Sequence, residues 1–155
     1  MQKKWLQAVS WDSVLTVNKA LCHAQKLEPL TRVKSLDAAR RLWETAMPRS
    51  LSLKEMLDVC RECHELSPFT FNNGNTFAAL GRTLIEECTK SLPLVEAQIV
   101  KTTASHYIAG MIGRRELLQV LKHFEQSWEP TAARLEQPTL RATPAPVLGE
   151  PQLQA

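Results

Sequence analysis

Apolar residues recur along the first 128 residues of this chain at the three- and four-residue spacing that is typical of amphipathic α-helices. Six segments carry this pattern. Their apolar positions are Val14, Val17 and Leu21; Leu36, Ala39, Leu42, Trp43 and Ala46; Leu53, Met56, Leu57, Cys60 and His64; Phe77, Leu80, Leu84 and Cys88; Ile99, Thr103 and Tyr107; and Leu117, Val120, Leu121 and Phe124. No alternating run is long enough to predict a strand. The pattern therefore predicts an all-α fold.

Residues that favour helix ends stand at the boundaries of these segments. Ser10 precedes the first segment, Ser35 precedes the second, and Asn75 or Thr76 precedes the fourth. Ser52 is followed three residues later by a glutamate, which is the arrangement of a capping box. We therefore expect the third helix to begin directly after Ser52.

The helical segments repeat with a period of about 40 residues, the length of a two-helix repeat unit. The series Leu-x-Leu-x-Glu at residues 51–55 returns at residues 92–96, and the apolar series of the fourth segment aligns with that of the sixth. The period predicts stacked helical hairpins, which form a short right-handed α-solenoid of about three helix pairs. The hairpins would span about residues 11–47, 52–90 and 93–128. An irregular helical bundle is the alternative that two aligned units leave open.

The second half of this region resembles a known repeat family. Phe77-Ala-Ala-Leu-Gly-Arg-Thr-Leu-Ile-Glu86, the pair Leu92-Pro93 and the run Arg115-Glu-Leu-Leu-Gln-Val-Leu121 are similar to octotricopeptide repeats and to the repeats that precede a RAP domain. The resemblance covers about residues 51–128. It implies a non-enzymatic α-helical-repeat protein that is a component of, or an RNA-associated factor on, an organellar ribonucleoprotein such as the mitochondrial ribosome. A mitochondrial location is implied as well. The alternative is a protein–protein scaffold or accessory subunit of a multisubunit complex that makes no direct RNA contact.

The two ends of the chain differ in composition from the helical region. Residues 1–10 contain two lysines and no acidic residue, and we expect them to be a basic lead that precedes a domain of residues 11–128. Residues 129–155 hold five of the nine prolines and no aromatic residue, so they are predicted to be an extended arm that a partner orders. No apolar run approaches the roughly 18 residues of a membrane span, so no membrane span is expected.

The net charge of +3 hides an uneven distribution. Residues 1–41 carry eight Lys or Arg against three Asp or Glu, whereas residues 42–96 carry five against eight. Basic side chains on helices can neutralise phosphates without reading bases, so nine of them are candidate RNA contacts. They are Lys19, Arg32, Lys34, Arg40, Arg41, Lys101, Arg114, Arg115 and Lys122.

Two further features bear on RNA contact. Lys19 and Lys101 occupy equivalent repeat positions and would project from the same side of a solenoid. The four tryptophans could stack on bases, although the one at position 43 follows an apolar row and is predicted to lie in the core. They are Trp5, Trp11, Trp43 and Trp128.

The series Cys60-Arg-Glu-Cys63-His64 matches the haem c attachment pattern C-x-x-C-H. Cys60 and His64, with Cys63 or Cys88 nearby, could also be ligands for zinc, but no second C-x-x-C completes a set of four. Cys60 falls on an apolar position of a predicted helix, so we expect small buried side chains and no cofactor. Cys60, Cys63 and His64 are the metal candidates.

Sequence patterns of catalysis are missing from the chain. There is no G-x-S-x-G elbow and no G-x-x-x-x-G-K loop. Ser105 and His106 are adjacent, which does not place them in a catalytic triad. The sequence therefore predicts that the protein is not an enzyme.

Overall fold

The computed structural model describes residues 2–124. Helices dominate this part of the chain, so the prediction of an all-α fold is confirmed. Residues 125–128 of the third hairpin and the predicted arm at 129–155 lie outside the described residues. The elements are β1 (Gln2–Lys3), α1 (Trp11–Ala24), α2 (Val33–Ala46), β2 (Leu51–Ser52), α3 (Leu53–Leu66), α4 (Asn73–Thr89), α5 (Leu94–Ile108) and α6 (Arg114–Phe124).

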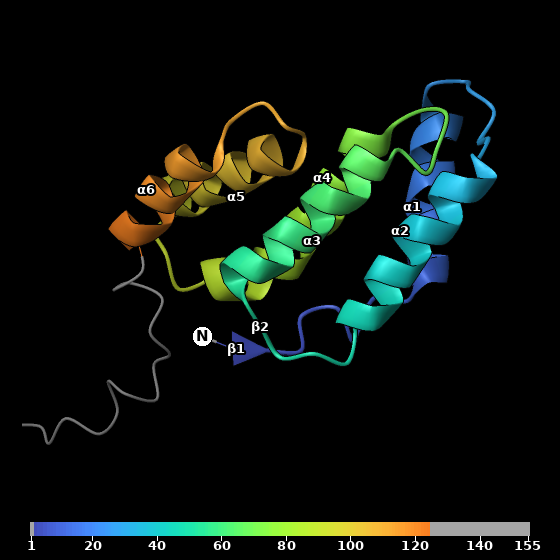
Figure 1. Cartoon of the computed structure of the whole chain (residues 1–155). Helices are drawn as coiled ribbons and strands as arrows, with labels where there is room; N and C mark the ends of the chain where they lie inside the picture. The colour runs from blue at the N-terminus through green and yellow to red at the C-terminus, as the bar shows by residue number, and fades with distance from the viewer. Residues whose placement is uncertain (1, 125–155) are drawn as a thin grey trace, which may run out of the picture.

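The helices are arranged as successive pairs along the molecule, with α1 and α2 at one end, α3 and α4 in the middle, and α5 and α6 at the other end (Figure 1). α4 packs against α1, α3 and α5, and is therefore the central helix. α2 packs on α3, and α6 packs on α5. α1 contacts α4 more extensively than it contacts α2. Contacts between pairs are thus as important to this fold as contacts within them.

Two of the helix starts follow the local sequence as predicted. The hydroxyl of Ser10 accepts a hydrogen bond of 3.2 Å from the backbone N–H of Ser13 at the start of α1. At α3, the hydroxyl of Ser52 accepts from the backbone N–H of Glu55 at 3.1 Å, and the Glu55 carboxylate accepts from the Ser52 N–H at 2.7 Å. The predicted capping box is therefore confirmed.

The predicted start of the second helix is wrong by three residues. α2 begins at Val33 instead of after Ser35, and Arg32 is its cap residue. The backbone N–H of Arg32 donates to the carbonyl of Pro68 at 2.9 Å, which ties the entry of α2 to the loop between α3 and α4. A contact between residues so distant in sequence leaves no mark on the local pattern, so the sequence could not place this boundary.

The predicted cap of the fourth helix at Asn75 or Thr76 is also wrong. α4 begins at Asn73, and Asn72 is its cap residue in the left-handed conformation. The side chain of Asn73 accepts from the backbone N–H of Phe69 at 2.9 Å and donates to the carbonyl of the same residue at 2.8 Å. This pair of bonds fixes the turn before α4, so the helix begins earlier in the sequence than predicted.

The N-terminal segment packs against the helices and is part of the folded domain. The composition of residues 1–10 predicts a basic lead separate from the helical domain, whereas Trp5 and Leu6 are buried in the core. β1 pairs with β2 in an antiparallel register that places Lys3 opposite Leu51. The indole N–H of Trp5 donates to the carbonyl of Leu51 at 2.9 Å, so the segment is fixed to the chain between α2 and α3.

An aromatic group forms the centre of the core where α1, α2 and α4 meet. The ring centroids of Trp43 and Phe77 lie 6.2 Å apart, those of Phe69 and Phe77 also 6.2 Å, and those of Trp11 and Trp43 6.4 Å. Trp43 is wholly buried, as predicted. These contacts join residues from the first and second helix pairs into one core.

The apolar row predicted for the fifth helix is partly wrong. Tyr107 is buried, but Ile99 is 43% exposed and Thr103 is half-buried. α5 carries apolar side chains on opposite faces, so its spacing alone does not identify the face that turns inward. The row that faces the core consists of Ala97, Val100, Ala104, Tyr107 and Ile108.

Candidate nucleic-acid interface

The basic side chains at the start of α2 are exposed and close in sequence. Arg32 caps the helix, and Lys34 and Arg41 project from it into solvent. Within residues 2–124, none of these three has an ion-pair partner. Arg40 differs, because its Nε lies 2.9 Å from the Glu44 carboxylate, which raises the pKa of Arg40. The cations of α2 that are free to meet a phosphate are therefore Arg32, Lys34 and Arg41.

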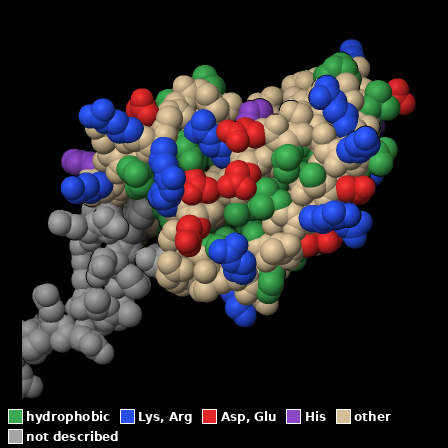
Figure 2. All heavy atoms as spheres, in the orientation of Figure 1, with side chains coloured by type: hydrophobic (Ala, Val, Ile, Leu, Met, Phe, Trp, Pro, Cys, Tyr) green, Lys and Arg blue, Asp and Glu red, His purple; other side chains and the backbone are tan. Residues whose placement is uncertain are grey.

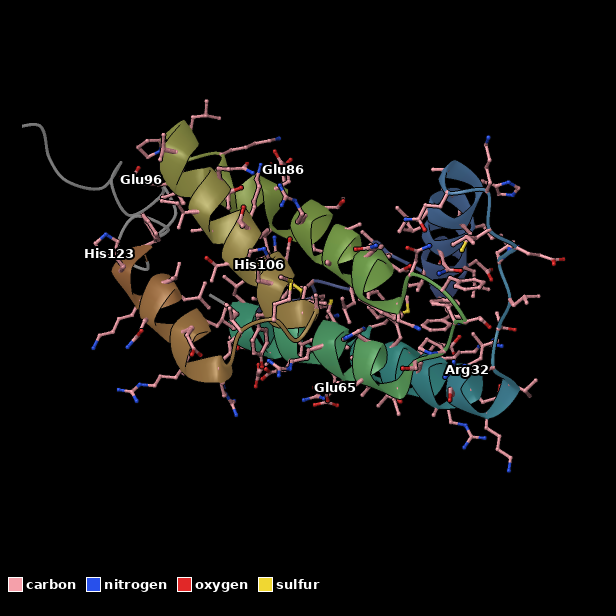
Figure 3. The ribbon with its side chains drawn as sticks, turned by 90° about the horizontal axis from the view of Figure 1, so that it is seen from above. Arg32, Glu65, Glu86, Glu96, His106 and His123 are labelled. Atoms are coloured by element: carbon pink, nitrogen blue, oxygen red, sulfur yellow. The ribbon has the colours of Figure 1, made fainter. Side chains whose placement is uncertain are left out.

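The three basic candidates at the start of α6 and along it belong to a different surface. Arg114 is engaged with Asp58 at 3.5 Å, whereas Arg115 and Lys122 are exposed. Figure 2 shows Lys and Arg over α2 and over α6, with Asp and Glu gathered over α3 between them. Arg32 and the end of α6 at His123 lie at opposite ends of the molecule (Figure 3). The nine candidates therefore do not form a single continuous patch.

The repeat-equivalent lysines lie in different environments. Lys19 is exposed on α1, whereas the side chain of Lys101 on α5 is only 18% exposed and its Nζ lies 2.7 Å from the Glu86 carboxylate of α4. The hydrogen bond from Lys101 lowers the pKa of Glu86. Cys60 lies halfway between Lys19 and Lys101 in the sequence and would be the equivalent position of the middle repeat, but it is fully buried. Lys101 thus joins α5 to α4.

The tryptophans that the structure describes are not available to stack on bases. Trp5 and Trp11, which are candidates for stacking in the sequence, are buried along with Trp43. Trp128 lies outside the described residues. The aromatic ring that sequence reasoning missed is Phe71, which is partly exposed in the loop before α4. Nothing in the local pattern distinguishes it from a core residue.

The cysteine–histidine series lies on α3, and its two cysteine side chains face the core. Cys60 and Cys63 are fully buried, and burial raises the pKa of the Cys60 thiol to about 12 and that of Cys63 further. The Cys60 thiol lies 4.0 Å from the Met56 sulfur, and the Cys63 thiol lies 3.8 Å from the carbonyl oxygen of Ala39. His64 has a buried Nδ1 without a hydrogen-bond partner. Among residues 2–124, no group of three or more His, Cys, Asp or Glu side chains is placed to hold a metal ion.

The adjacent Ser105 and His106 make no catalytic pair in the described structure. The hydroxyl of Ser105 donates to the carbonyl of Lys101, one turn earlier in α5, at 2.9 Å. This is the ordinary local bond of a helical serine. Gly110, with φ of +77°, lies in the turn that joins α5 to α6.

α5 exposes a row of apolar side chains to solvent. Leu94 is 86% exposed and Val95 is 71% exposed, and Ile99 follows them one turn later. A shallow open hollow runs along the same face, and it is lined by Leu94, Val95, Gln98, Ile99, Thr102 and Thr103. We call these six residues the α5 strip. The sequence does not reveal this strip, because Ile99 and Thr103 are predicted to belong to a core row with Tyr107 and nothing local marks Leu94 and Val95 as exposed.

The chain matches no protein-family model, no curated protein and no solved structure. None of the helices between residues 2 and 124 is both long enough and apolar enough to cross a membrane.

Proposed function

We propose that this chain is a non-enzymatic α-helical subunit of an organellar ribonucleoprotein, such as the mitochondrial ribosome, and that it contacts RNA phosphates through Arg32, Lys34 and Arg41. The observation that carries the proposal is the exposure of these three cations without an acidic partner among residues 2–124. An exposed cation without an acidic partner loses no ion pair when it binds a phosphate. Binding also releases counterions from the RNA.

The proposal includes a short right-handed solenoid that carries the basic surface of Arg32, Lys34 and Arg41. Support comes from the succession of three helix pairs along the molecule (Figure 1) and from the contacts of α2 with α3 and of α4 with α5. In this solenoid α2 lies at one end of the row, where an extended polymer can reach it. Residues 129–155 would serve as an arm held by a neighbouring subunit, and the protein would reside in the mitochondrion.

Salt-dependent RNA binding tests the proposal. The purified full chain should bind single-stranded RNA with an affinity that falls as salt rises. Changing Arg32, Lys34 and Arg41 together to Gln should weaken binding and reduce the slope of log affinity against log salt by about 2, because each lost phosphate contact contributes about 0.7.

The matched control removes two cations from the opposite end of the molecule. Arg115→Gln combined with Lys122→Gln should leave RNA affinity nearly unchanged. Equal losses in both variants would show a response to net charge alone, and a wild-type chain that binds no RNA at low salt would exclude direct RNA contact.

The second candidate function is a protein–protein scaffold or accessory subunit without direct RNA contact. The α5 strip favours it, because contiguous exposed apolar side chains, here Leu94, Val95 and Ile99, are typical of protein-binding surfaces. The RNA experiment separates the two candidates, since a scaffold of this kind would show no salt-dependent RNA binding.

A further inference from the structure

The two ends of the row of helix pairs differ in the chemistry of their outer faces. After Val33, the exposed side chains of α2 are mostly charged or polar, including Lys34, Asp37, Arg41 and Glu44. α5 at the other end exposes Leu94, Val95, Gln98 and Ile99. The terminal units of stacked helical repeats need a polar outer face to remain soluble alone. The exposed face of α5 in the third pair does not meet this requirement.

Each boundary inside the molecule brings apolar helix faces together. α4 receives the inward row of α5, which includes Val100 and Ile108, and Gly81 of α4 lies against Ile108. The α5 strip lies on the other side of the same helix and is exposed. It is therefore placed where the next helix of the row would pack.

The composition of the α5 strip restricts what can cover it. Its six residues include no Lys, Arg, Asp or Glu, so it offers no charge for a phosphate or for an acidic peptide. The residues form two adjacent rows that run about 15 Å along the helix, at 1.5 Å per residue. A stable dimer of identical chains commonly uses about 20 or more residues on each side, which is far more than this strip provides. Its length and width match a single helix that lies along α5.

We propose that the α5 strip is the docking site for an amphipathic α-helix of a partner protein. The partner helix presents apolar side chains at three- and four-residue spacing, covers Leu94, Val95 and Ile99, and extends the row of helix pairs beyond α5. The inference does not depend on RNA contact at α2, because the two surfaces lie at opposite ends of the molecule (Figure 3).

Site-specific photo-crosslinking tests this inference in the full chain. A benzophenone amino acid at position 95, introduced in the cells that make the protein, should form one discrete adduct with another polypeptide. Mass spectrometry should map the attachment to a segment with apolar residues at i, i+3 or i+4, and i+7. The same group at position 37, on the polar face of α2, is the matched control and should not crosslink to that segment.

A synthetic peptide of the mapped segment then provides a direct measurement. It should bind the purified chain as a helix, and Val95→Glu should weaken this binding at least tenfold. Val95 is exposed, so the substitution should leave the circular dichroism spectrum and the RNA affinity of the chain unchanged. Lys122→Glu, at an exposed position of α6, should leave peptide binding intact.

Several outcomes would overturn the inference. The adduct at position 95 could map to residues 125–155 of the same chain, to a second copy of the chain or to RNA, and each result would identify a different occupant. An attachment segment without helical apolar spacing, a peptide that binds wild-type and Val95→Glu equally, or no adduct at position 95 would also contradict it. The RNA proposal would be unaffected by any of these results except an adduct with RNA, which would relocate its contact surface.

Discussion

The hydroxyl of Tyr107 donates a hydrogen bond of 2.5 Å to Oδ1 of Asp58 and so joins α5 to α3. Asp58 also lies 3.5 Å from the guanidinium of Arg114, and the guanidinium of Arg61 lies 4.5 Å from the centre of the Tyr107 ring. These four side chains link α3, α5 and α6. Burial, followed by the bond to Asp58, raises the pKa of Tyr107 to about 12.

We expect the free energy of unfolding to fall as the pH rises above 10. In the unfolded chain Tyr107 loses its proton near its ordinary pKa of about 10, whereas in the folded chain it keeps the proton to about 12. Deprotonation therefore favours the unfolded state between these values, and the stabilisation is fully present at lower pH. Urea unfolding across this pH range measures the effect.

Tyr107 is the only tyrosine in the chain, so its phenolate absorbance reports the titration directly. The midpoint should lie near 12 in the folded protein and near 10 in urea. Tyr107→Phe is the control, and it should flatten the corresponding part of the stability profile. A folded-state midpoint near 10 would contradict the assigned environment.

The contact between α4 and α5 at Gly81 has room for a side chain only if the end of the Ile108 side chain shifts. A methyl group at this position would overlap Cδ1 of Ile108, which is fully buried. We expect Gly81→Ala to lower the free energy of unfolding by up to about 2 kcal/mol, because an overpacking cost of about 1–3 kcal/mol outweighs the gain in helix propensity of about 1 kcal/mol. Urea denaturation measures the change. Adding Ile108→Val removes Cδ1 and should recover part of the loss, whereas a stabilised Gly81→Ala chain would disprove close packing at this point.

Helix positions and the α3 cap could be predicted because their causes are local. Burial of one face imposes a spacing that the sequence displays, and Ser52 and Glu55 bond within a single turn. The start of α2 depends on Pro68, which is distant in sequence and belongs to the loop between α3 and α4. A boundary fixed by such a long-range bond is not visible in a window of a few residues. The start of α4 depends on local bonds between Asn73 and Phe69, but several neighbouring asparagines favour a cap position, so the pattern does not single out the right one.

The candidate site shows the same division between local and long-range causes. The exposure of Lys34 and Arg41 follows from their places on the polar face of an amphipathic helix, which the sequence displays. The pairing of Lys101 with Glu86 depends on how α5 is rotated against α4. That rotation could not be derived, because α5 is apolar on opposite faces and its exposed residue Ile99 resembles a core residue in sequence.

The N-terminal segment should contribute directly to stability. Trp5 is buried and donates its indole N–H to the carbonyl of Leu51. We expect Trp5→Ala to cost about 3–5 kcal/mol, as for other buried aromatic truncations. Lys4→Ala changes an exposed neighbour in the same segment and should have little effect. Similar urea midpoints for Trp5→Ala and Lys4→Ala would show that residues 1–10 do not belong to the folded domain.

The capping box of α3 should give a pH-dependent contribution that a simple cap does not. Ser52→Ala is expected to cost about 1 kcal/mol at neutral pH. The bond from the Ser52 backbone N–H lowers the pKa of Glu55 below its ordinary value of 4.5, so the carboxylate's contribution is present above that pH and is lost as the pH falls through the lowered value.

Ser10→Ala is the matched control for this effect, because the Ser10 cap of α1 has no carboxylate partner. Chemical denaturation from neutral pH to pH 3 should therefore show the cost of Glu55→Gln, which removes the carboxylate that accepts from the Ser52 backbone N–H, shrinking on acidification while that of Ser10→Ala stays nearly constant. A parallel pH dependence for the two variants would contradict the role assigned to Glu55.

The cysteines should separate into one reactive thiol and three protected ones. Cys88 is half-buried, whereas Cys22, Cys60 and Cys63 are fully buried, and burial raises the pKa of the Cys60 thiol to about 12. Because the thiolate is the reactive form and must also be reached by solvent, we expect maleimide to modify Cys88 first. Peptide mass spectrometry over time measures each site.

Cys88→Ala should remove the fast phase and leave the slow one, and added urea should accelerate only the slow phase. Zinc added to the folded chain should not change either rate, because the thiols of Cys60 and Cys63 are inaccessible and hold their protons. Fast modification of Cys60 or Cys63, or its suppression by zinc, would instead indicate that the C-x-x-C-H series opens to solvent and can act as a metal site.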